Sequence, residues 1–514
     1  MPYEHWFVSR QKRQLTTILP ALVAFSDVCL GEVWSGNHEL QLKFEDELQN
    51  RSITEHGKLR ARKTGDGGGG IRTLFKQMKD LGLVFTEDDN KKCRLTLMGE
   101  SLVRGDLSFV EGMRVQLQKY QYPSATSFSG SGSISRRFNV HPFQFIFRLL
   151  TDDRLSNYLH IDEMRFIVIH FADSDSDKCF EEVVSDILFF RKMNTLNRPI
   201  SNPEDKEKTY WNIANTFFNY ISLTQYIDRG KSSILLRKER EAQARGFIQY
   251  KPKFIPHPEL QENYIRAFGR GTAAKDLRDF EKEKATSQHE LIEKRIRQEF
   301  VLLCLKKPVN SITSDIVLSI SDKTGINEAM VEKTLIRNYP HGNIDDFFTS
   351  YRELAHMGTA GATDFEKATV ELFRNVFHMN AIHVGPIGNT PDVFVESDEY
   401  RYCGILDNKA YKNGYSIIGD HKRRMIDEYI PNYKQYGHTE YPLGFFSYIA
   451  GSFGKGIDIQ ISEISARTGI SGSAMPVDIL IDFAEDYNKN NYTHEDIRRI
   501  FSLGKLIKLE DINL

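Results

Sequence analysis

A short alternation of apolar and charged residues in the C-terminal third constrains this chain more than any other feature. Two apolar runs, Val393–Val395 and Cys403–Leu406, flank a polar turn, and runs bounded in this way predict the two strands of a hairpin. Asp392 opens the first strand, and Asp407 and Lys409 lie two positions apart on the second. Because side chains alternate between the faces of a strand, Asp407 and Lys409 point to one face, beside the strand that carries Asp392. The sequence therefore predicts two carboxylates and one ammonium in a single patch.

This patch has the inventory that metal-dependent phosphodiester hydrolysis uses. Two carboxylates hold Mg²⁺ through hard oxygen ligands and leave several of its positions to water and a phosphate oxygen. The metal lowers the pKa of a bound water, while a neighbouring lysine orients or deprotonates it. Pro391-Asp392 followed by Asp407-Asn408-Lys409 has the form PD...(D/E)xK, with the carbonyl of Asn408 as a further candidate ligand. The triplet alone is more typical of a solvated strand edge than of a metal site, so it does not by itself establish the chemistry.

Longer blocks around the triplet resemble the FokI cleavage domain of type IIS restriction endonucleases. The likeness follows the chain in order through Pro391-Asp392, Ile405–Tyr411, Gly414-Tyr415, Phe446–Phe453 and Glu495–Phe501. The resemblance implies a PD-(D/E)xK nuclease domain with a central mixed sheet flanked by helices. It also implies Mg²⁺ as the cofactor and Asp392, Asp407 and Lys409 as the catalytic residues, with both aspartates as metal ligands.

The segments before and after the hairpin add two further expectations. Asp364–Phe373 has the spacing of an amphipathic helix, and in nucleases of this type such a helix often lends a carboxylate to the metal. Glu366 is the first candidate and Glu371 the alternative, although either is also explained as a surface charge. Asp420–Met425 predicts the start of a helix in the region that pairs two FokI-type domains. The basic run Lys422–Arg424 departs from the mixed charges expected there, so a helix lying along DNA is the alternative.

The amino-acid composition limits the number of domains and the class of protein, but it does not identify the function. At 514 residues there is material for about three or four domains. Hydrophobic residues make up 40% and charged residues 27%, and the net charge of −2 requires any contact with DNA to come from local basic faces. The five cysteines form no CxxC or Cys/His cluster, and the N-terminus lacks the apolar core of a signal peptide. We therefore expect a cytoplasmic protein.

A basic, glycine-rich segment near the N-terminus predicts contact with DNA. Between Arg51 and Lys79, eight basic residues stand against Glu55 and Asp66, and Gly65–Gly70 precedes a predicted helix. A glycine-rich loop before a helix brings backbone N–H groups close to phosphate, but the Gly-Lys-Ser/Thr ending of a nucleotide P-loop is missing. The glycines alone are as typical of a flexible surface loop. The DNA-binding candidates, including two from a later Ser/Gly-rich segment, are Arg60, Arg62, Lys63, Arg72, Lys76, Arg136 and Arg137.

The pattern after the glycines is that of a winged helix. An amphipathic helix from Ile71, a strand at Leu83–Phe85, a charged turn, a strand at Arg94–Leu97 and a helical start at Met98 follow in this order. Winged helices also serve as protein-protein modules, so the pattern does not establish DNA binding. Downstream, the sequence predicts a second helical subdomain with helices at Phe143–Leu150, Ile161–His170, Asp177–Met193 and Thr209–Ile227.

The N-terminal half resembles, more loosely, the recognition region of the AlwI family of type IIS endonucleases and their nicking relatives. The likeness lies in Trp6–Ser9, Leu81–Phe85, Leu95-Thr96 and Gln121–Ser124. We expect an α/β (α+β) multidomain protein with a mostly helical N-terminal recognition region. Its predicted parts are a winged-helix-like subdomain (1–125), a second helical DNA-recognition subdomain (126–272), a helical linker (273–350) and the nuclease (351–514).

The expected function is site-specific cleavage of double-stranded DNA outside the recognised sequence, as in a restriction-modification system. One catalytic site cuts one strand, so a double-strand break requires a transient homodimer or a second nuclease subunit. A strand-specific nicking enzyme, or the large subunit of a heterodimeric restriction enzyme, is the first alternative. A non-catalytic winged-helix DNA-binding regulator is the alternative from another class.

Overall fold

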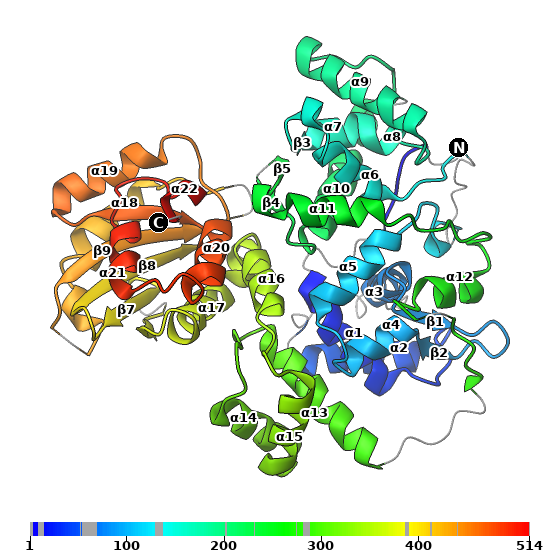
Figure 1. The fold of residues 1–514 in the computed structure, drawn as a ribbon, viewed down its shortest axis with the longest axis horizontal. Coiled ribbons are helices and arrows are strands. Elements are labelled where there is room, and N and C mark those ends of the chain that lie inside the picture. Colours follow the sequence, from blue (N-terminus) through cyan, green and yellow to red (C-terminus); the bar gives the residue numbers. More distant parts are fainter. Residues whose placement is uncertain are drawn as a thin grey trace. The chain divides into compact units, whose positions relative to one another are not determined.

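The chain forms two compact units (Figure 1). The computed structural model describes residues 4–8, 15–51, 53, 69–128, 137–200, 203–230, 232–273, 275–280, 288–385, 390–411, 414–438 and 440–512. Unit 1 consists of Met1–Leu302 with Ser314–Asn338, and unit 2 of Leu303–Thr313 with Tyr339–Leu514. Mixed helix and sheet in both units confirm the α+β multidomain class. The four-part division expected from the sequence stays a prediction.

Unit 1 begins with three helices followed by a hairpin. The hairpin pairs Val84 with Leu95 in antiparallel register, and Leu30 and Val33, between the first two helices, form bridges to its second strand and turn. Thr96 ends the hairpin and caps the next helix, because its hydroxyl accepts a hydrogen bond from the Gly99 N–H. The predicted helix–strand–turn–strand–helix order is confirmed by α3 (Gly69–Asp80), β1 (Val84–Thr86), β2 (Cys93–Leu95) and α4 (Leu97–Val103). Two helices precede it, α1 (Ile18–Val28) and α2 (His38–Asn50).

The rest of unit 1 is helical around a small sheet that the sequence analysis did not anticipate. Three strands pair in the antiparallel order β3-β5-β4. Each has three or four residues, which is too short for alternation to stand out from the flanking helical patterns. The elements are α5 (Phe109–Lys119), α6 (Pro142–Leu150), β3 (Tyr158–His160), α7 (Ile161–Glu163), a π-turn (Met164–Val168), α8 (Ile169–Phe171), α9 (Asp177–Met193), α10 (Pro203–Ser222), β4 (Ile227–Arg229), β5 (Ser233–Leu236), α11 (Glu241–Gln249) and α12 (Gln261–Phe268).

The predicted helical linker (273–350) is not helical at its start. Residues 275–279 form no helix, and Arg278 there pairs with Asp276 and with Glu100 of α4, contacts that hold the segment against α4 within unit 1. Helices then follow at α13 (Gln288–Cys304), α14 (Ser314–Thr324) and α15 (Glu328–Asn338). Within the described ranges, none of the helices has the length and apolar character needed to span a lipid bilayer.

Unit 2 is built on a five-stranded mixed sheet in the order β10-β9-β8-β7-β6. The β6–β7 and β7–β8 pairs are antiparallel, whereas β8–β9 and β9–β10 are parallel. This confirms the expected central mixed sheet with flanking helices. Its elements are α16 (Asp345–Leu354), α17 (Ala362–Asn375), β6 (Asn380–His383), β7 (Val393–Ser397), β8 (Tyr402–Lys409), α18 (Gly419–Arg424), a π-turn (Met425–Tyr429), β9 (Leu443–Ala450), α19 (Ile457–Thr468), β10 (Gly472–Pro476), α20 (Val477–Tyr487), α21 (His494–Phe501) and α22 (Leu509–Ile512).

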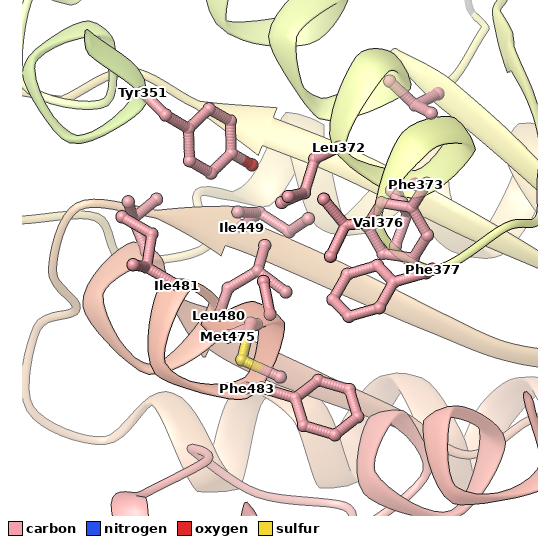
Figure 2. Packing of buried hydrophobic residues seen from close by; sticks show 14 of the residues in the cluster. Tyr351, Leu372, Phe373, Val376, Phe377, Ile449, Met475, Leu480, Ile481 and Phe483 are labelled. Carbon is pink, nitrogen blue, oxygen red and sulfur yellow. The ribbon is translucent and has the colours of Figure 1, made fainter. Parts of the chain in front are cut away.

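Each face of this sheet is covered by its own apolar core. On one face, α16, α17, α20 and α21 pack against Val393, Leu406 and Ile449. Figure 2 shows side chains of α17 and α20 meeting there with Ile449 of β9 and Met475 of β10. On the other face, the π-turn after α18 and helix α19 pack against Ile405 and Tyr448. The two faces of β8 are therefore supported by different helices, and this separation positions the candidate site.

Candidate active site

The structure brings the three predicted catalytic side chains together at one end of the β7–β8 hairpin. Val393 pairs with Leu406, so Asp392 and Asp407 come next to each other where the two strands continue. The Nζ atom of Lys409 lies 2.8 Å from Oδ2 of Asp407 and 3.7 Å from Oδ2 of Asp392. The backbone N–H of Asn408 donates a 2.7 Å hydrogen bond to the same Oδ2 of Asp392. The predicted patch of two carboxylates and one ammonium is present.

Strand alternation decides which side of the sheet carries this patch. Cys403 and Ile405 belong to the core under α19, and Asp407 and Lys409 continue their alternation on that face. Asn408 lies between them and turns its side chain to the opposite face. Asp407 is also paired across the ladder with Tyr448 of β9, so an aromatic side chain stands next to the patch.

The patch is buried, which gives its charges large effects on one another. The side chain of Asp407 is 2% exposed, that of Lys409 11% and that of Asp392 20%. Burial raises the pKa of Asp392 well above its ordinary value, and the nearby charges of Asp407 and Glu366 raise it further. Burial alone would lower the pKa of Lys409, but the attraction of Asp407 and Asp392 outweighs it and raises that pKa. The lysine is therefore held as an ammonium.

One oxygen of the patch is left without a partner. Among the described residues, no donor makes a hydrogen bond with Oδ1 of Asp407, although this atom is buried. A buried carboxylate oxygen without a partner lowers the stability of the fold unless a cation binds it or a water donates a hydrogen bond to it. No group of three or more His, Cys, Asp or Glu side chains in the described ranges is arranged to hold a metal. The donor set here is two carboxylates, with oxygen atoms of the type that Mg²⁺ prefers.

Glu366 lies near the patch but is engaged by a residue that the sequence did not reveal. Its Oε2 is 2.8 Å from Nε2 of His383, which ends β6, and its charge acts on Asp392. The alternative, Glu371, accepts a 3.0 Å hydrogen bond from the side chain of Asn375 on its own helix. Of the two, Glu366 is the one whose charge raises the pKa of Asp392. Its partner His383 lies 17 residues away, so no local spacing signals the pair.

A group of aromatic side chains extends the same face of the sheet. The Tyr415 hydroxyl and Nδ1 of His421 are 2.8 Å apart, and the Tyr448 hydroxyl donates to the His421 carbonyl at 3.3 Å. Burial raises the pKa of Tyr429 to about 12, and the charge of Asp407 adds to this effect. Burial and the charge of Lys409 lower the pKa of His421. Protonated hydroxyls and an imidazole thus lie near the acidic pair. Tyr415 and Tyr448 belong to blocks that resemble the FokI cleavage domain, but the sequence analysis assigned no role to any of these aromatic residues.

The basic run after the hairpin is paired with acidic side chains. Lys422 forms an ion pair with Glu463 of α19. Arg423 and Arg424 both pair with Asp420, at 3.0 and 2.7 Å. The alternative that this helix lies along DNA stays a prediction. Each of its three cations forms an ion pair with an acidic side chain.

The structure places only part of the predicted DNA-binding set. Arg60, Arg62, Lys63 and Arg136 lie outside the described residues. Arg72 is exposed on α3, and Lys76, one turn later, is half-buried with its ammonium 6.0 Å from the Phe7 ring. Arg137 pairs with Glu4 at 3.0 Å and donates to the His170 carbonyl at 2.7 Å. The role of each of these residues in DNA binding stays a prediction.

Solved structures with similar chains include restriction endonuclease FokI, free and bound to DNA, and the binding domain of the BpuJ1 endonuclease in complex with modified DNA. Each FokI structure is 12% identical with a TM-score of 0.31, and the match covers 96% of this chain and 97% of that one. The BpuJ1 match is 15% identical with a TM-score of 0.36, over 52% of this chain and 95% of the other. At these TM-scores no common fold is established. No curated protein sequence matches the chain.

Two family models match the chain in separate regions. The model for the FokI cleavage domain matches residues 325–508, which include the hairpin and its patch. The model for the N-terminal domain of the type II restriction endonuclease HgaI matches residues 110–228. Together they support a type IIS restriction enzyme. Residues 325–508 are thus similar to the FokI cleavage domain, and residues 110–228 to the N-terminal domain of HgaI.

Proposed function

We propose that the protein is a type IIS site-specific endonuclease. It binds a short sequence in double-stranded DNA through its N-terminal region and hydrolyses phosphodiester bonds outside that sequence with Mg²⁺, as part of a restriction-modification system. The observation that carries the proposal is the convergence of Asp392, Asp407 and Lys409 on one face of β7 and β8, inside the FokI-type domain. A site without function has no use for two carboxylates, one of them buried, that each lie within 4 Å of the same ammonium.

The residues present fit a divalent cation. Oδ1 of Asp407 is buried without a protein partner in the described structure, and the second carboxylate, Asp392, is destabilised in its charged form by burial and by its acidic neighbours. A cation between the two carboxylates would relieve both conditions. Asp392 and Asp407 would hold it, with the carbonyl of Asn408 and the carboxylate of Glu366 as further candidates. When bound, the ion supplies a water of lowered pKa and neutralises charge that develops on the phosphate.

The chain's own residues account for the rest of the chemistry. Lys409 is held as an ammonium and lies between the two carboxylates, so it can donate hydrogen bonds to an attacking water and to a phosphate oxygen. The N–H of Asn408 fixes the orientation of the Asp392 carboxylate. In-line attack by water then leaves 5′-phosphate and 3′-hydroxyl ends with inversion at phosphorus.

Recognition is assigned to the N-terminal region. The HgaI-type match at 110–228, the hairpin β1–β2 beside α3, and the exposed Arg72 on that helix support this assignment. The looser likeness to the AlwI family is part of the proposal and concerns the same region. Because recognition and chemistry lie in different units of the chain, the cut is expected at a distance from the recognised sequence.

One patch of this kind cuts one strand. A double-strand break therefore needs a second nuclease domain, from a transient homodimer or from another subunit. A protein that only nicks would retain the same patch and the same recognition region. The ratio of nicked to linear product from a plasmid with one site, measured over a range of protein concentrations, separates these forms.

The test of the proposed function is cleavage of supercoiled plasmid by the purified full-length protein in Mg²⁺, followed by sequencing of the fragment ends. Defined ends are expected, and they should disappear in EDTA and in Asp407→Ala. The end sequences would give the recognised site and the cut distance together. Sequence-specific binding without cleavage in Mg²⁺ or Mn²⁺ would overturn the proposal and favour a DNA-binding regulator.

A further inference from the structure

The face of β8 opposite the catalytic patch carries a buried hydrogen-bond junction. Nδ2 of Asn408 donates to the hydroxyl of Thr369 on α17 at 2.6 Å. The same hydroxyl is 2.7 Å from that of Tyr351 on α16 and donates to the Phe365 carbonyl at 3.0 Å. Thr369 and Tyr351 are fully buried, and Asn408 is 7% exposed. One threonine thus joins two helices to the strand that carries Asp407 and Lys409.

The direction of each hydrogen bond at the junction can be assigned. A threonine hydroxyl has one hydrogen and two acceptor lone pairs. Its hydrogen goes to the Phe365 carbonyl, which can only accept, so Thr369 must accept from both Asn408 and Tyr351. Burial raises the pKa of Tyr351, which keeps its hydroxyl protonated and able to donate. The hydroxyl of Thr369 therefore uses its full hydrogen-bonding capacity.

The junction reaches the catalytic patch through a single residue. Asn408 lies between Asp407 and Lys409 in the chain, and its N–H donates to Oδ2 of Asp392. A rotation of Asn408 about the strand axis would reorient the side chains of Asp407 and Lys409. It would also break the hydrogen bond from the Asn408 N–H to Asp392. The helix that holds Asn408 also bears Glu366, one turn before Thr369. The other helix is fixed within unit 2 by an ion pair of Arg352 with Asp478 on α20.

We propose that Thr369 is a positioning residue for the catalytic patch. It holds Asn408 from the far face of the sheet and so keeps the Asn408 N–H, Asp407 and Lys409 aligned with Asp392. This inference rests on the proposed function, since the aligned groups are those assigned to metal binding and hydrolysis. Residues that orient metal ligands without touching the metal commonly change metal affinity or activity about 10- to 100-fold when they are removed.

Two substitutions at Thr369 separate the hydroxyl from the shape of the side chain. Thr369→Val keeps the volume and removes every hydrogen bond at the junction, whereas Thr369→Ser keeps the hydroxyl and removes a methyl group. Ser473→Ala is the matched control, because Ser473 shares a buried 2.9 Å hydroxyl pair with Ser447 in the same sheet, between β9 and β10. A purely structural role predicts similar behaviour for Thr369→Val and Ser473→Ala.

The experiment compares these full-length proteins in three measurements: deuterium exchange of peptides that cover β8, the Mn²⁺-induced rise in Tm, and single-turnover cleavage with Mg²⁺. Thr369→Val should exchange faster over β8, should need about tenfold more Mn²⁺ for the same Tm rise, and should cleave about 10- to 100-fold more slowly with unchanged DNA affinity. Thr369→Ser should restore all three, and Ser473→Ala should lower Tm without changing the cleavage rate.

Wild-type exchange over β8, together with a wild-type response to Mn²⁺ in Thr369→Val, would overturn the inference. Equal loss of cleavage in Thr369→Val and Ser473→Ala would also overturn it, because general destabilisation would then explain the result. Absence of cleavage by the wild type would overturn the proposed function instead. In that case the exchange and Mn²⁺ measurements still decide whether Thr369 positions the acidic pair.

Discussion

Successive residues of β8 face two different environments. On one face, Asp407 and Lys409 share a buried patch with Asp392, in which one carboxylate oxygen has no partner among the described residues. On the other face, Asn408 binds Thr369, whose hydroxyl has every hydrogen-bonding position filled. The first face carries the charged groups, and the second supports the strand through Thr369, while Oδ1 of Asn408 is, like Oδ1 of Asp407, buried without a partner among the described residues. We therefore expect activity to depend on both faces of the strand, although the proposed chemistry is on one.

The comparison explains why the charged face is tolerated in a folded domain. Like charges close together in a buried site are unfavourable, and natural proteins commonly retain such unfavourable groups where activity requires them. The apolar cores on both faces and the junction at Thr369 supply the stability that holds them in place. Substitutions on the two faces should therefore differ in how they change activity and stability. Changes on the charged face remove activity, and some of them increase stability.

Among changes that keep both carboxylates, the largest effect is expected from loss of the ammonium on the charged face. Lys409→Ala should reduce single-turnover cleavage on the order of 10³-fold, because it removes the donor directed at the water and the phosphate. DNA affinity should remain within about twofold of wild type, since recognition is assigned to unit 1. Lys489→Ala is the control, because Lys489 lies on the same domain in an exposed ion pair with Asp486. If Lys409→Ala cleaves at the same rate as the control, Lys409 has no role in catalysis.

A smaller effect should distinguish the two glutamates of α17. Glu366 acts electrostatically on Asp392, whereas Glu371 is occupied by Asn375 on its own helix. Glu366→Gln should lower the cleavage rate about 10- to 100-fold and raise the Mg²⁺ concentration needed for half-maximal activity. Glu371→Gln should change the rate by no more than about twofold. Cleavage and Mg²⁺ titration of the matched pair measure this, and the reverse order of effects would assign the role to Glu371.

Replacing the Asp392 carboxylate with an amide should raise the stability of the metal-free protein while it lowers activity. The pKa of this carboxyl is raised in the folded state, so the folded protein binds its proton more tightly than the unfolded chain does. Its contribution to stability is therefore favourable at low pH and is lost as the pH rises through the folded-state pKa. Asp392→Asn should stabilise the metal-free protein by about 1 kcal/mol at pH 8, with a smaller gain at lower pH.

Urea unfolding in EDTA at several pH values measures this difference for Asp392→Asn. The variant should also lose cleavage and any stabilisation by Mg²⁺. A variant that is less stable than wild type at every pH would show that Lys409 and the Asn408 N–H fully compensate the buried charge.

The smallest effect concerns the N-terminal helix α3. Arg72→Ala and Lys76→Ala should each weaken DNA binding a few-fold and reduce the slope of log affinity against log salt by about 1, as expected for loss of one phosphate contact. Cleavage at saturating protein should not change. Arg104→Ala is the control, since Arg104 on the same unit is paired with Asp106 at 3.2 Å. An unchanged salt slope would place the phosphate contacts elsewhere.

The part of the site that follows local rules was predictable from the sequence. Two strands joined by a short polar turn, with a side-chain period of two, are sufficient to bring Asp392, Asp407 and Lys409 together. The predicted strands extend slightly further in the structure, to Ser397 and Lys409. The mixed sheet and the amphipathic helix before the hairpin came from the resemblance and from apolar spacing, and both are confirmed.

The supporting groups were not predictable because they depend on tertiary packing. Tyr351 and Thr369 are 18 residues apart, and Thr369 and Asn408 are 39 apart, so only the packing of α16 and α17 on the sheet joins them. The same holds for His383 beside Glu366. In the N-terminal region, strands of three or four residues left no periodic signal, and the small sheet beside the helices was missed.

The most direct test of the central claim is a Mg²⁺ titration of single-turnover cleavage by wild-type protein and Asp407→Asn, with protein in excess over a duplex that contains the recognised site. The wild-type rate should rise to a plateau with Mg²⁺, whereas Asp407→Asn should bind the duplex equally well and show no measurable cleavage at any Mg²⁺ concentration. Cleavage by Asp407→Asn at the wild-type rate, or wild-type cleavage that persists in EDTA, would contradict the assignment of this patch as a metal-dependent catalytic centre.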